Sequence, residues 1–159
     1  MIKATINNIE VEVPEGTSIL WAAKKAGFTI PTLCNHPDLE PGGQCGICVV
    51  EIDGIPGLKR ACMTPVGDGF KVRTHTPRVM ATRKQLVELI LSNHDTDCLT
   101  CARNNSCELQ QLAATLGINV LNYEKSKERL PIDRSSVAIV RDPNKCILCG
   151  RCIEVCSRV

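Results

Sequence analysis

Twelve residues whose types could bind metal stand in three closely patterned runs of this 159-residue chain: all eleven cysteines and one of the three histidines. Iron–sulfur clusters are held mainly by cysteine thiolates, commonly with four ligands to a cluster. The number of candidate ligands therefore suffices for three clusters and predicts an electron carrier. The runs are Cys34, Cys45, Cys48 and Cys62; His94, Cys98, Cys101 and Cys107; and Cys146, Cys149, Cys152 and Cys156.

The first run has the spacing C-x10-C-x2-C-x13-C, which favours a [2Fe–2S] cluster. Structural zinc sites usually contain paired C-x2-C units, whereas Cys45 and Cys48 form one pair flanked by two distant single cysteines. The loop over residues 31–48 is rich in proline and glycine, so neither a helix nor a central strand is expected there. Because glycine has no Cβ atom, such a loop can approach an inorganic core closely.

The second run has the spacing H-x3-C-x2-C-x5-C. Taken alone, His94 is more often an ordinary exposed or hydrogen-bonded histidine than a ligand. The three cysteines of this run could hold an incomplete cluster or zinc. His36 and His75 have no incomplete ligand set beside them and are expected to face solvent.

The third run has the spacing C-x2-C-x2-C-x3-C, which resembles a bacterial ferredoxin motif. In two-cluster ferredoxins the last cysteine of such a run binds the other cluster. We therefore expect Cys146, Cys149 and Cys152 to share one [4Fe–4S] cluster whose fourth ligand is open. Cys156 could bind the same cluster or another. The sequence is accordingly expected to be either the front of a longer chain or a small subunit whose last cluster is closed by Cys156 or by a partner's ligand.

Short elements are predicted around these runs. Alternating residues on both sides of Asn7-Asn8 predict a hairpin of residues 4–6 and 9–13. A helix is expected over residues 19–26, capped by Thr17 or Ser18 and ended by Gly27. Further strands are expected at residues 49–52 and 70–72, with turns at residues 53–54 and 67–69.

Two helices are predicted beside the second run. Residues 78–91 form an amphipathic pattern with an apolar stripe through Val79, Leu86, Leu89 and Ile90. A second helix is expected over residues 108–116, ended by Gly117.

Composition and charge exclude several classes of protein. The formal net charge is +2 and no dense run of Lys or Arg occurs, so nucleic-acid binding is not indicated. No apolar stretch is long enough for a membrane span, and the N-terminus lacks the layout of a secretory signal. A cytoplasmic location is expected, where thiols are more often metal ligands than disulfides. No dinucleotide fingerprint, phosphate loop or catalytic residue set is visible, which leaves open whether the protein is an enzyme.

Three segments of the first 75 residues carry a family resemblance: Thr32-Leu33-Cys34, the sequence GQCGICVVE over residues 43–51, and ACMTP over residues 61–65. They are similar to plant-type-like ferredoxin domains of the β-grasp fold. More narrowly, they resemble the N-terminal region of the large iron–sulfur subunit of NADH dehydrogenase and its relatives, the NAD(P)-linked iron-only hydrogenases and formate dehydrogenases. The resemblance implies that Cys34, Cys45, Cys48 and Cys62 hold a [2Fe–2S] cluster.

The resemblance extends over the other two runs. The second run, which continues as Cys107-Glu108-Leu109-Gln110, is similar to a segment of the same family in which one histidine and three cysteines hold a [4Fe–4S] cluster. This similarity implies that His94 is a ligand. The flank Asp142-Pro143-Asn144-Lys145-Cys146 resembles the hydrogenase and formate dehydrogenase members and implies a second [4Fe–4S] cluster.

The expected fold class is α+β. We predict a β-grasp [2Fe–2S] domain over residues 1–77 and a small helical [4Fe–4S] domain over residues 78–117. A polar connection over residues 118–137 then leads to an incomplete ferredoxin-like [4Fe–4S] segment over residues 138–159.

The predicted function is the relay of single electrons within a cytosolic NAD(P)-linked oxidoreductase complex. The expected partners are a subunit that binds flavin and NAD(P) and has its own iron–sulfur centres, and a further redox subunit or domain. Two alternatives remain: the front end of a catalytic iron-only hydrogenase or formate dehydrogenase chain, and a zinc-stabilised interaction module.

Overall fold

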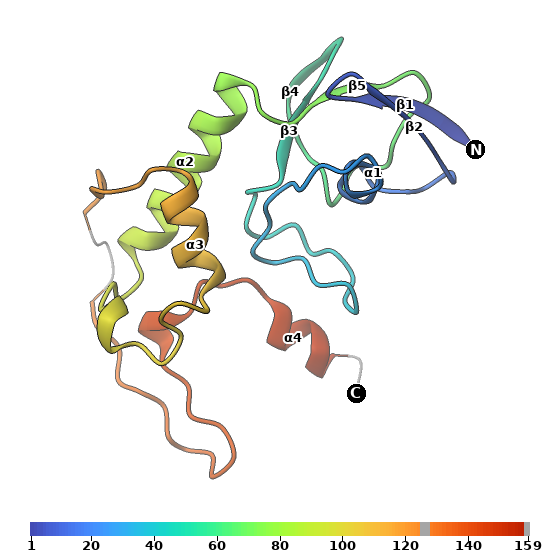
Figure 1. Ribbon diagram of the computed structural model, residues 1–159. Coiled ribbons are helices and arrows are strands. Elements are labelled where there is room, and N and C mark those ends of the chain that lie inside the picture. Colours follow the sequence, from blue (N-terminus) through green and yellow to red (C-terminus); the bar gives the residue numbers. More distant parts are fainter. Residues whose placement is uncertain (125–127, 158–159) are drawn as a thin grey trace. The chain divides into compact units, whose positions relative to one another are not determined.

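The structure is a computed structural model that describes residues 1–124 and 128–157. It divides into two compact units (Figure 1). The first comprises Met1–Arg83 and Gly150–Val159, and the second comprises Lys84–Cys149. Of the polar connection predicted over residues 118–137, Lys125, Ser126 and Lys127 lie outside the described residues.

The first unit contains a mixed five-stranded sheet with the order β2-β1-β5-β3-β4. The strands are β1 (Ile2–Ile6), β2 (Ile9–Val13), β3 (Val49–Ile52), β4 (Ile55–Arg60) and β5 (Lys71–Arg73). β1 runs parallel to β5, and the other neighbouring pairs are antiparallel. The sheet and the helices confirm a mixed α+β fold.

The predicted first hairpin is confirmed. β1 pairs with β2 in a register that places Ile6 opposite Ile9, and the two residues between them have φ values of 46° and 72°. A two-residue turn with positive φ at both positions matches the right-handed twist of its strands, and asparagine tolerates this conformation. The turn fixes which side chains of both strands face the core.

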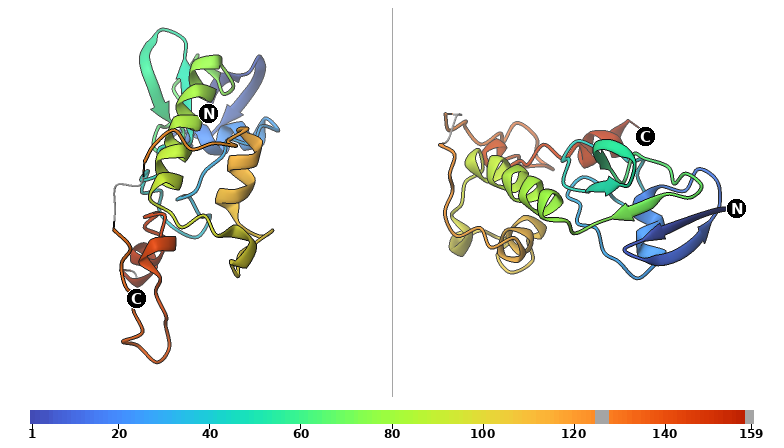
Figure 2. Two further views of the ribbon diagram at one scale, coloured as in Figure 1. Left: turned by 90° about the vertical axis from the view of Figure 1, so that its left-hand side faces the viewer. Right: turned by 90° about the horizontal axis from the view of Figure 1, so that it is seen from above.

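Helix α1 (Ile19–Lys25) is also confirmed. The Ser18 hydroxyl accepts a hydrogen bond from the Trp21 N–H, and Gly27 follows the helix with a φ of 84°, as a left-handed helix ending requires. Ile19, Ala22 and Ala23 are buried in one cluster with residues from the inner face of the sheet. α1 therefore covers this face of the sheet, and Figures 1 and 2 show this packing from different sides.

Sequence reasoning missed β4. This strand contains Pro56 and Gly57, two residues that weaken a strand prediction. β4 lies at the end of the strand order, where an edge strand tolerates proline because one side of its backbone pairs with no neighbour. The hairpin of β3 and β4 then carries the chain back toward the end of β3 at which Cys48 stands.

The remaining elements are helical. Helix α2 (Pro77–Ser92) matches its predicted position, and α3 (Glu108–Thr115) ends before Gly117 as expected. Two 3-10 turns, η1 (Cys98–Thr100) and η2 (Pro143–Lys145), and the short helix α4 (Arg151–Cys156) were not predicted. No helix among the described residues is long and apolar enough to cross a membrane.

The buried face of α2 differs from the predicted stripe. Val79 is buried as expected, but Leu89 is 46% exposed. The residues that continue the buried row from Val79 are Arg83 and Val87, each four positions further along. Residues four apart lie on one helix face, so a charged side chain occupies the middle of a buried row.

Candidate metal centres

The four cysteines of the first run are brought together in the first unit. Cys34 and Cys45 lie on the proline- and glycine-rich loop, Cys48 directly precedes β3, and Cys62 closely follows β4. Because β3 and β4 pair with Val49 opposite Arg60, the last two cysteines meet at one end of the hairpin. Their Sγ atoms are 3.3 Å apart, and the Ala61 N–H donates to the Cys48 carbonyl over 3.0 Å.

The thiols of this set perturb one another. The hydrogen bond shared with Cys62, helped by nearby backbone N–H groups, lowers the pKa of Cys48 to about 6. The same hydrogen bond and burial raise the pKa of Cys62 well above its ordinary value. Burial is also the main cause that raises the pKa of Cys34, and Cys45 contributes to it. The charges of Cys34, Cys48 and Cys62 therefore depend on one another, with the negative charge most stable on Cys48.

This arrangement suits a metal centre better than a set of ordinary core cysteines. Thiolates are the metal-binding form, and a thiol with a lowered pKa is deprotonated at neutral pH. Three of the four cysteines are buried, so their mutual repulsion as thiolates needs a positive centre to offset it. The donor set fits a cluster held by four thiolates.

The loop around this set is held by backbone contacts that depend on glycine. Gly43 has a φ of 67°, and its carbonyl accepts a hydrogen bond of 2.7 Å from Arg60 Nη1. A Cβ atom built on Gly43 would lie 2.8 Å from Met63 Cγ. A side chain at position 43 would therefore have to displace the Met63 side chain and would occupy a strained backbone conformation.

The second run begins after α2, whose second half belongs to the second unit, and continues to the start of α3. His94 comes just after α2, and its backbone N–H donates to the Leu91 carbonyl over 3.1 Å. Cys98 is the first residue of η1, Cys101 directly follows η1, and Cys107 is the N-cap residue of α3. All three cysteines are partly exposed.

One atom of His94 fits the predicted ligand role. Its Nδ1 is buried and has no hydrogen-bond partner among the described residues. Buried polar atoms almost always have a partner, and an unpartnered one often indicates a missing water or ion. The imidazole nitrogen is thus a suitable donor for iron.

The third run is distributed between the two units. Cys146 follows η2, and Cys149 ends the second unit. Cys152 and Cys156 lie on α4 in the first unit, four residues apart and both exposed. Leu148 and Gly150 have φ values of 54° and 76°, which turn the backbone twice within this short run.

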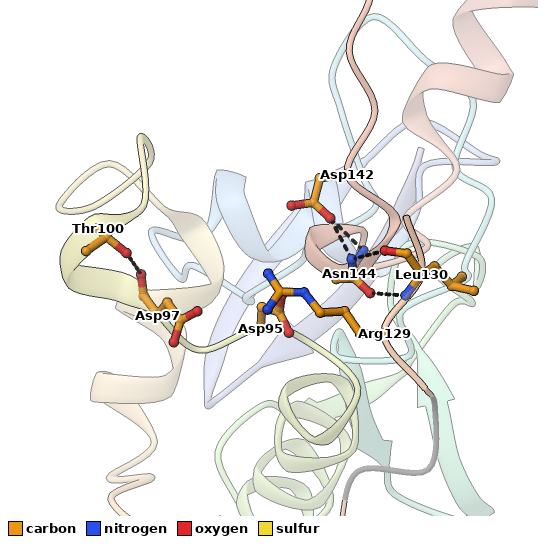
Figure 3. A network of polar contacts seen from close by, with 7 residues as sticks. All are labelled: Asp95, Asp97, Thr100, Arg129, Leu130, Asp142 and Asn144. Atoms are coloured by element: carbon orange, nitrogen blue, oxygen red, sulfur yellow. Dashed lines mark hydrogen bonds and ion pairs between the residues drawn. The ribbon is translucent and has the colours of Figure 1, made fainter. Parts of the chain in front are cut away.

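Asn144, two residues before Cys146, links this run to the second run within the second unit. Its side chain accepts a hydrogen bond from the Leu130 N–H over 2.9 Å and donates to the Leu130 carbonyl over 2.8 Å. Its backbone carbonyl accepts from the N–H of Asp95, which follows His94, over 2.9 Å. Figure 3 shows the side-chain contacts, with Arg129 directed at the Asp95 carboxylate. Asn144 is therefore a structural link between the segments that carry His94 and Cys146.

The remaining histidines agree with expectation in part. His75 is exposed, whereas His36 is partly exposed and its Nδ1 accepts a hydrogen bond from the Asp38 N–H over 3.3 Å. Among residues 1–124 and 128–157, no group of three or more His, Cys, Asp or Glu side chains is arranged to hold a single metal ion. The ligand sets therefore rest on the motifs, on the coupled thiols of the first run and on the unpartnered His94 nitrogen.

Sequence reasoning missed two residues near these sites, Arg83 and Asn144. Arg83 is a basic residue among the polar positions of its helix, although its four-residue spacing from Val79 and from Val87 is visible in the sequence. Asn144 stands out in the sequence only as part of the segment that flanks Cys146. In both cases the partners far away in the sequence are backbone carbonyls or amides, which leave no mark in the sequence.

Three protein families match this chain in consecutive segments. A 2Fe-2S iron-sulfur cluster binding domain matches residues 1–77, and the NADH-ubiquinone oxidoreductase-G iron-sulfur binding region matches residues 83–120. A 4Fe-4S binding domain matches residues 139–157. The chain thus has one [2Fe–2S] domain followed by two [4Fe–4S] segments.

Curated relatives match the whole chain. NADP-reducing hydrogenase subunit HndD of Solidesulfovibrio fructosivorans is 41% identical over 100% of this chain and 28% of its own length. An NADH-quinone oxidoreductase subunit of Rhizobium meliloti is 37% identical over 100% of this chain and 19% of its own. NADPH-Fe(3+) oxidoreductase subunit alpha of Geobacter sulfurreducens is 40% identical over 98% of this chain and 18% of its own length. The chain therefore spans less than a third of the length of these relatives.

A solved structure shares the fold. A chain of the NAD+-reducing [NiFe]-hydrogenase, crystallised in the H2-reduced state, superposes with a TM-score of 0.90 at 30% sequence identity. The match covers 99% of this chain and 66% of that chain.

Proposed function

Because the chain belongs to the iron–sulfur region that NADH-quinone oxidoreductases share with NAD(P)-linked hydrogenases, we propose that it relays single electrons within an NAD(P)-linked oxidoreductase complex. The proposed donor is a flavoprotein partner that oxidises NADH or NADPH. The proposed acceptor is a further redox site in the same chain or in another subunit. Transfer in the reverse direction uses the same sites.

The observation that carries this proposal is the coupled set of thiols in the first run. We propose that Cys34, Cys45, Cys48 and Cys62 hold the [2Fe–2S] cluster, which supplies one-electron chemistry when bound. The lowered pKa of Cys48 keeps this residue in the metal-binding form at neutral pH. Three of the four cysteines are buried, and the hairpin of β3 and β4 fixes the positions of the last two ligands.

We further propose that His94, Cys98, Cys101 and Cys107 hold a [4Fe–4S] cluster. The buried, unpartnered Nδ1 of His94 supports this assignment. Neutral imidazole in place of a thiolate removes one negative charge from the ligand set, which favours the reduced form. For the second [4Fe–4S] cluster we propose Cys146, Cys149 and Cys152, with Cys156 as a ligand of the same or another cluster.

A second candidate function is supported by the relatives. The identity of 41% to part of a hydrogenase subunit supports the proposal that this region is the electron-transfer segment of a catalytic hydrogenase chain. In both candidates the residues of this region have the same task, which is to position and tune the clusters. The length and domain content of the native gene product distinguish the two.

Metal analysis of the anaerobically purified protein tests the proposal. We expect about ten irons and about ten sulfides per chain, as one [2Fe–2S] and two [4Fe–4S] clusters require, with matching electron paramagnetic resonance signals. Cys45→Ser should remove the [2Fe–2S] signal and about two irons, while Cys101→Ser should remove about four. A colourless protein loaded with zinc would contradict the relay function.

A further inference from the structure

Arg83 is buried beside the first metal centre. Its side chain is 1% exposed and is among the largest fully buried side chains of the described residues. Its Nε donates to the Ile47 carbonyl over 3.1 Å, and its Nη2 donates to the Val49 carbonyl over 2.8 Å. These two residues flank Cys48 on both sides. A single guanidinium therefore spans the backbone of a proposed cluster ligand.

The charge of Arg83 has no carboxylate partner within the part of the chain that the structure describes. Its two acceptors are neutral carbonyls, and Nη1 has only the Met80 sulfur at 3.9 Å. Burial lowers the pKa of Arg83, and the negative charge of Cys48 acts in the opposite direction. A buried charge is costly unless an opposite charge compensates it. Cys48, whose two sequence neighbours Arg83 holds, would supply that opposite charge as a ligand of the proposed cluster.

We propose that Arg83 is the internal counter-charge of the first metal centre and raises the reduction potential of its [2Fe–2S] cluster. This inference rests on the proposed cluster site. A [2Fe–2S] cluster on four thiolates has about two negative charges when oxidised and about three when reduced. The fixed positive charge beside Cys48 therefore stabilises the reduced form more than the oxidised form.

Arg83 has a second effect on the same ligand. Its planar side chain donates to the carbonyls of residues 47 and 49. These two bonds fix the backbone on both sides of Cys48, just before β3. A lysine keeps the charge but cannot donate from two fixed nitrogens to both carbonyls. Glutamine keeps part of the hydrogen bonding but not the charge. The two substitutions separate the electrostatic role from the structural one.

Redox titration of the [2Fe–2S] signal by electron paramagnetic resonance tests the proposal, with dithionite as the one-electron reductant. We expect Arg83→Gln and Arg83→Met to lower the equilibrium constant for reduction about tenfold, which is about 59 mV for a one-electron couple. Arg83→Lys keeps the positive charge, so its reduction potential should stay close to that of the unsubstituted protein. Arg78→Gln is the matched control, because Arg78 lies on the same helix but is 63% exposed, where solvent screens its charge.

The outcomes decide between the two roles. Neutral variants that retain the cluster at the unchanged potential would overturn the proposal, as would a lysine variant that behaves like the glutamine variant. The neutral variants could lose the cluster altogether. In that case, a cluster retained in Arg83→Lys supports the counter-charge role, and a cluster lost from Arg83→Lys overturns it. Absence of a [2Fe–2S] signal from the unsubstituted protein would instead contradict the proposed function itself.

Discussion

Replacing Asn144 with alanine should selectively loosen the second unit. Asn144 is 5% exposed, and its amide holds both backbone groups of Leu130 while the Asp142 side chain accepts from it. The substitution leaves the backbone bond between Asn144 and Asp95 in place. It removes the side-chain bonds that hold the segment before Cys146 to the segment at Leu130, and the local bond to the Asp142 carboxylate.

The size of the effect follows from the groups left without partners. A buried backbone donor or acceptor that loses its partner costs about 1–3 kcal/mol. Leu130 is 51% exposed, so water replaces part of the lost bonding. We therefore expect a total cost of about 2 kcal/mol, which increases the population of locally opened molecules about thirtyfold. The neighbouring ion pair of Arg129 and Asp95 contributes less, because the arginine is 69% exposed.

The assay is anaerobic iron release to a chelator, followed for each cluster by its spectroscopic signal. If release proceeds through local opening, the [4Fe–4S] signals of Asn144→Ala should decay about thirty times faster, while the [2Fe–2S] signal keeps its original rate. Asn7→Gly is the reciprocal control. It removes the two bonds between Asn7 and Thr74 in the first unit and tolerates the φ of 46°. Equal [4Fe–4S] decay rates in Asn144→Ala and the unsubstituted protein would refute this reasoning.

Two further substitutions test the first and second metal centres. His94→Cys should lower the midpoint potential of one [4Fe–4S] cluster, because a thiolate adds a negative charge that imidazole lacks; a redox titration with an unchanged or higher value would rule out His94 as a ligand. Gly43→Ala should weaken retention of the [2Fe–2S] cluster, because the new Cβ meets Met63 and the φ of 67° disfavours alanine. Iron content and the visible spectrum measure this loss, and a fully loaded, unchanged alanine variant would show that the close contact at position 43 is dispensable.

Local patterns predicted the elements whose signals lie within a few residues. The Asn7-Asn8 turn, the Ser18 cap and the glycines after α1 and α3 each specify a local backbone conformation, and the structure contains all of them. β4 was missed for the opposite reason. Its stability comes from pairing with β3, a tertiary interaction that outweighs the poor strand propensity of Pro56 and Gly57.

The candidate ligands of the metal centres could be predicted from the sequence, but the residues that surround those ligands could not. Spacing and family resemblance identified the candidate ligands, because cysteine positions are explicit in a sequence. The burial of Arg83 could not be read in the same way. Arginine is normally placed on the polar face of a helix, and only the carbonyls of residues 47 and 49, more than thirty positions away, explain why it lies inside. Long-range partners of this kind are absent from any local pattern.

The close approach of Cys48 and Cys62 makes the iron-free protein vulnerable to oxygen. A thiol with a pKa of about 6 is largely thiolate at neutral pH, and a second sulfur lies only 3.3 Å away. Both sulfurs are buried in the folded chain, so oxidation to a sulfenic acid and then to a disulfide proceeds when the unfolded or locally opened chain exposes them. Such a disulfide would consume two candidate ligands in one event, so iron delivery competes with air oxidation. A newly made chain therefore needs a reducing environment until its first cluster is inserted.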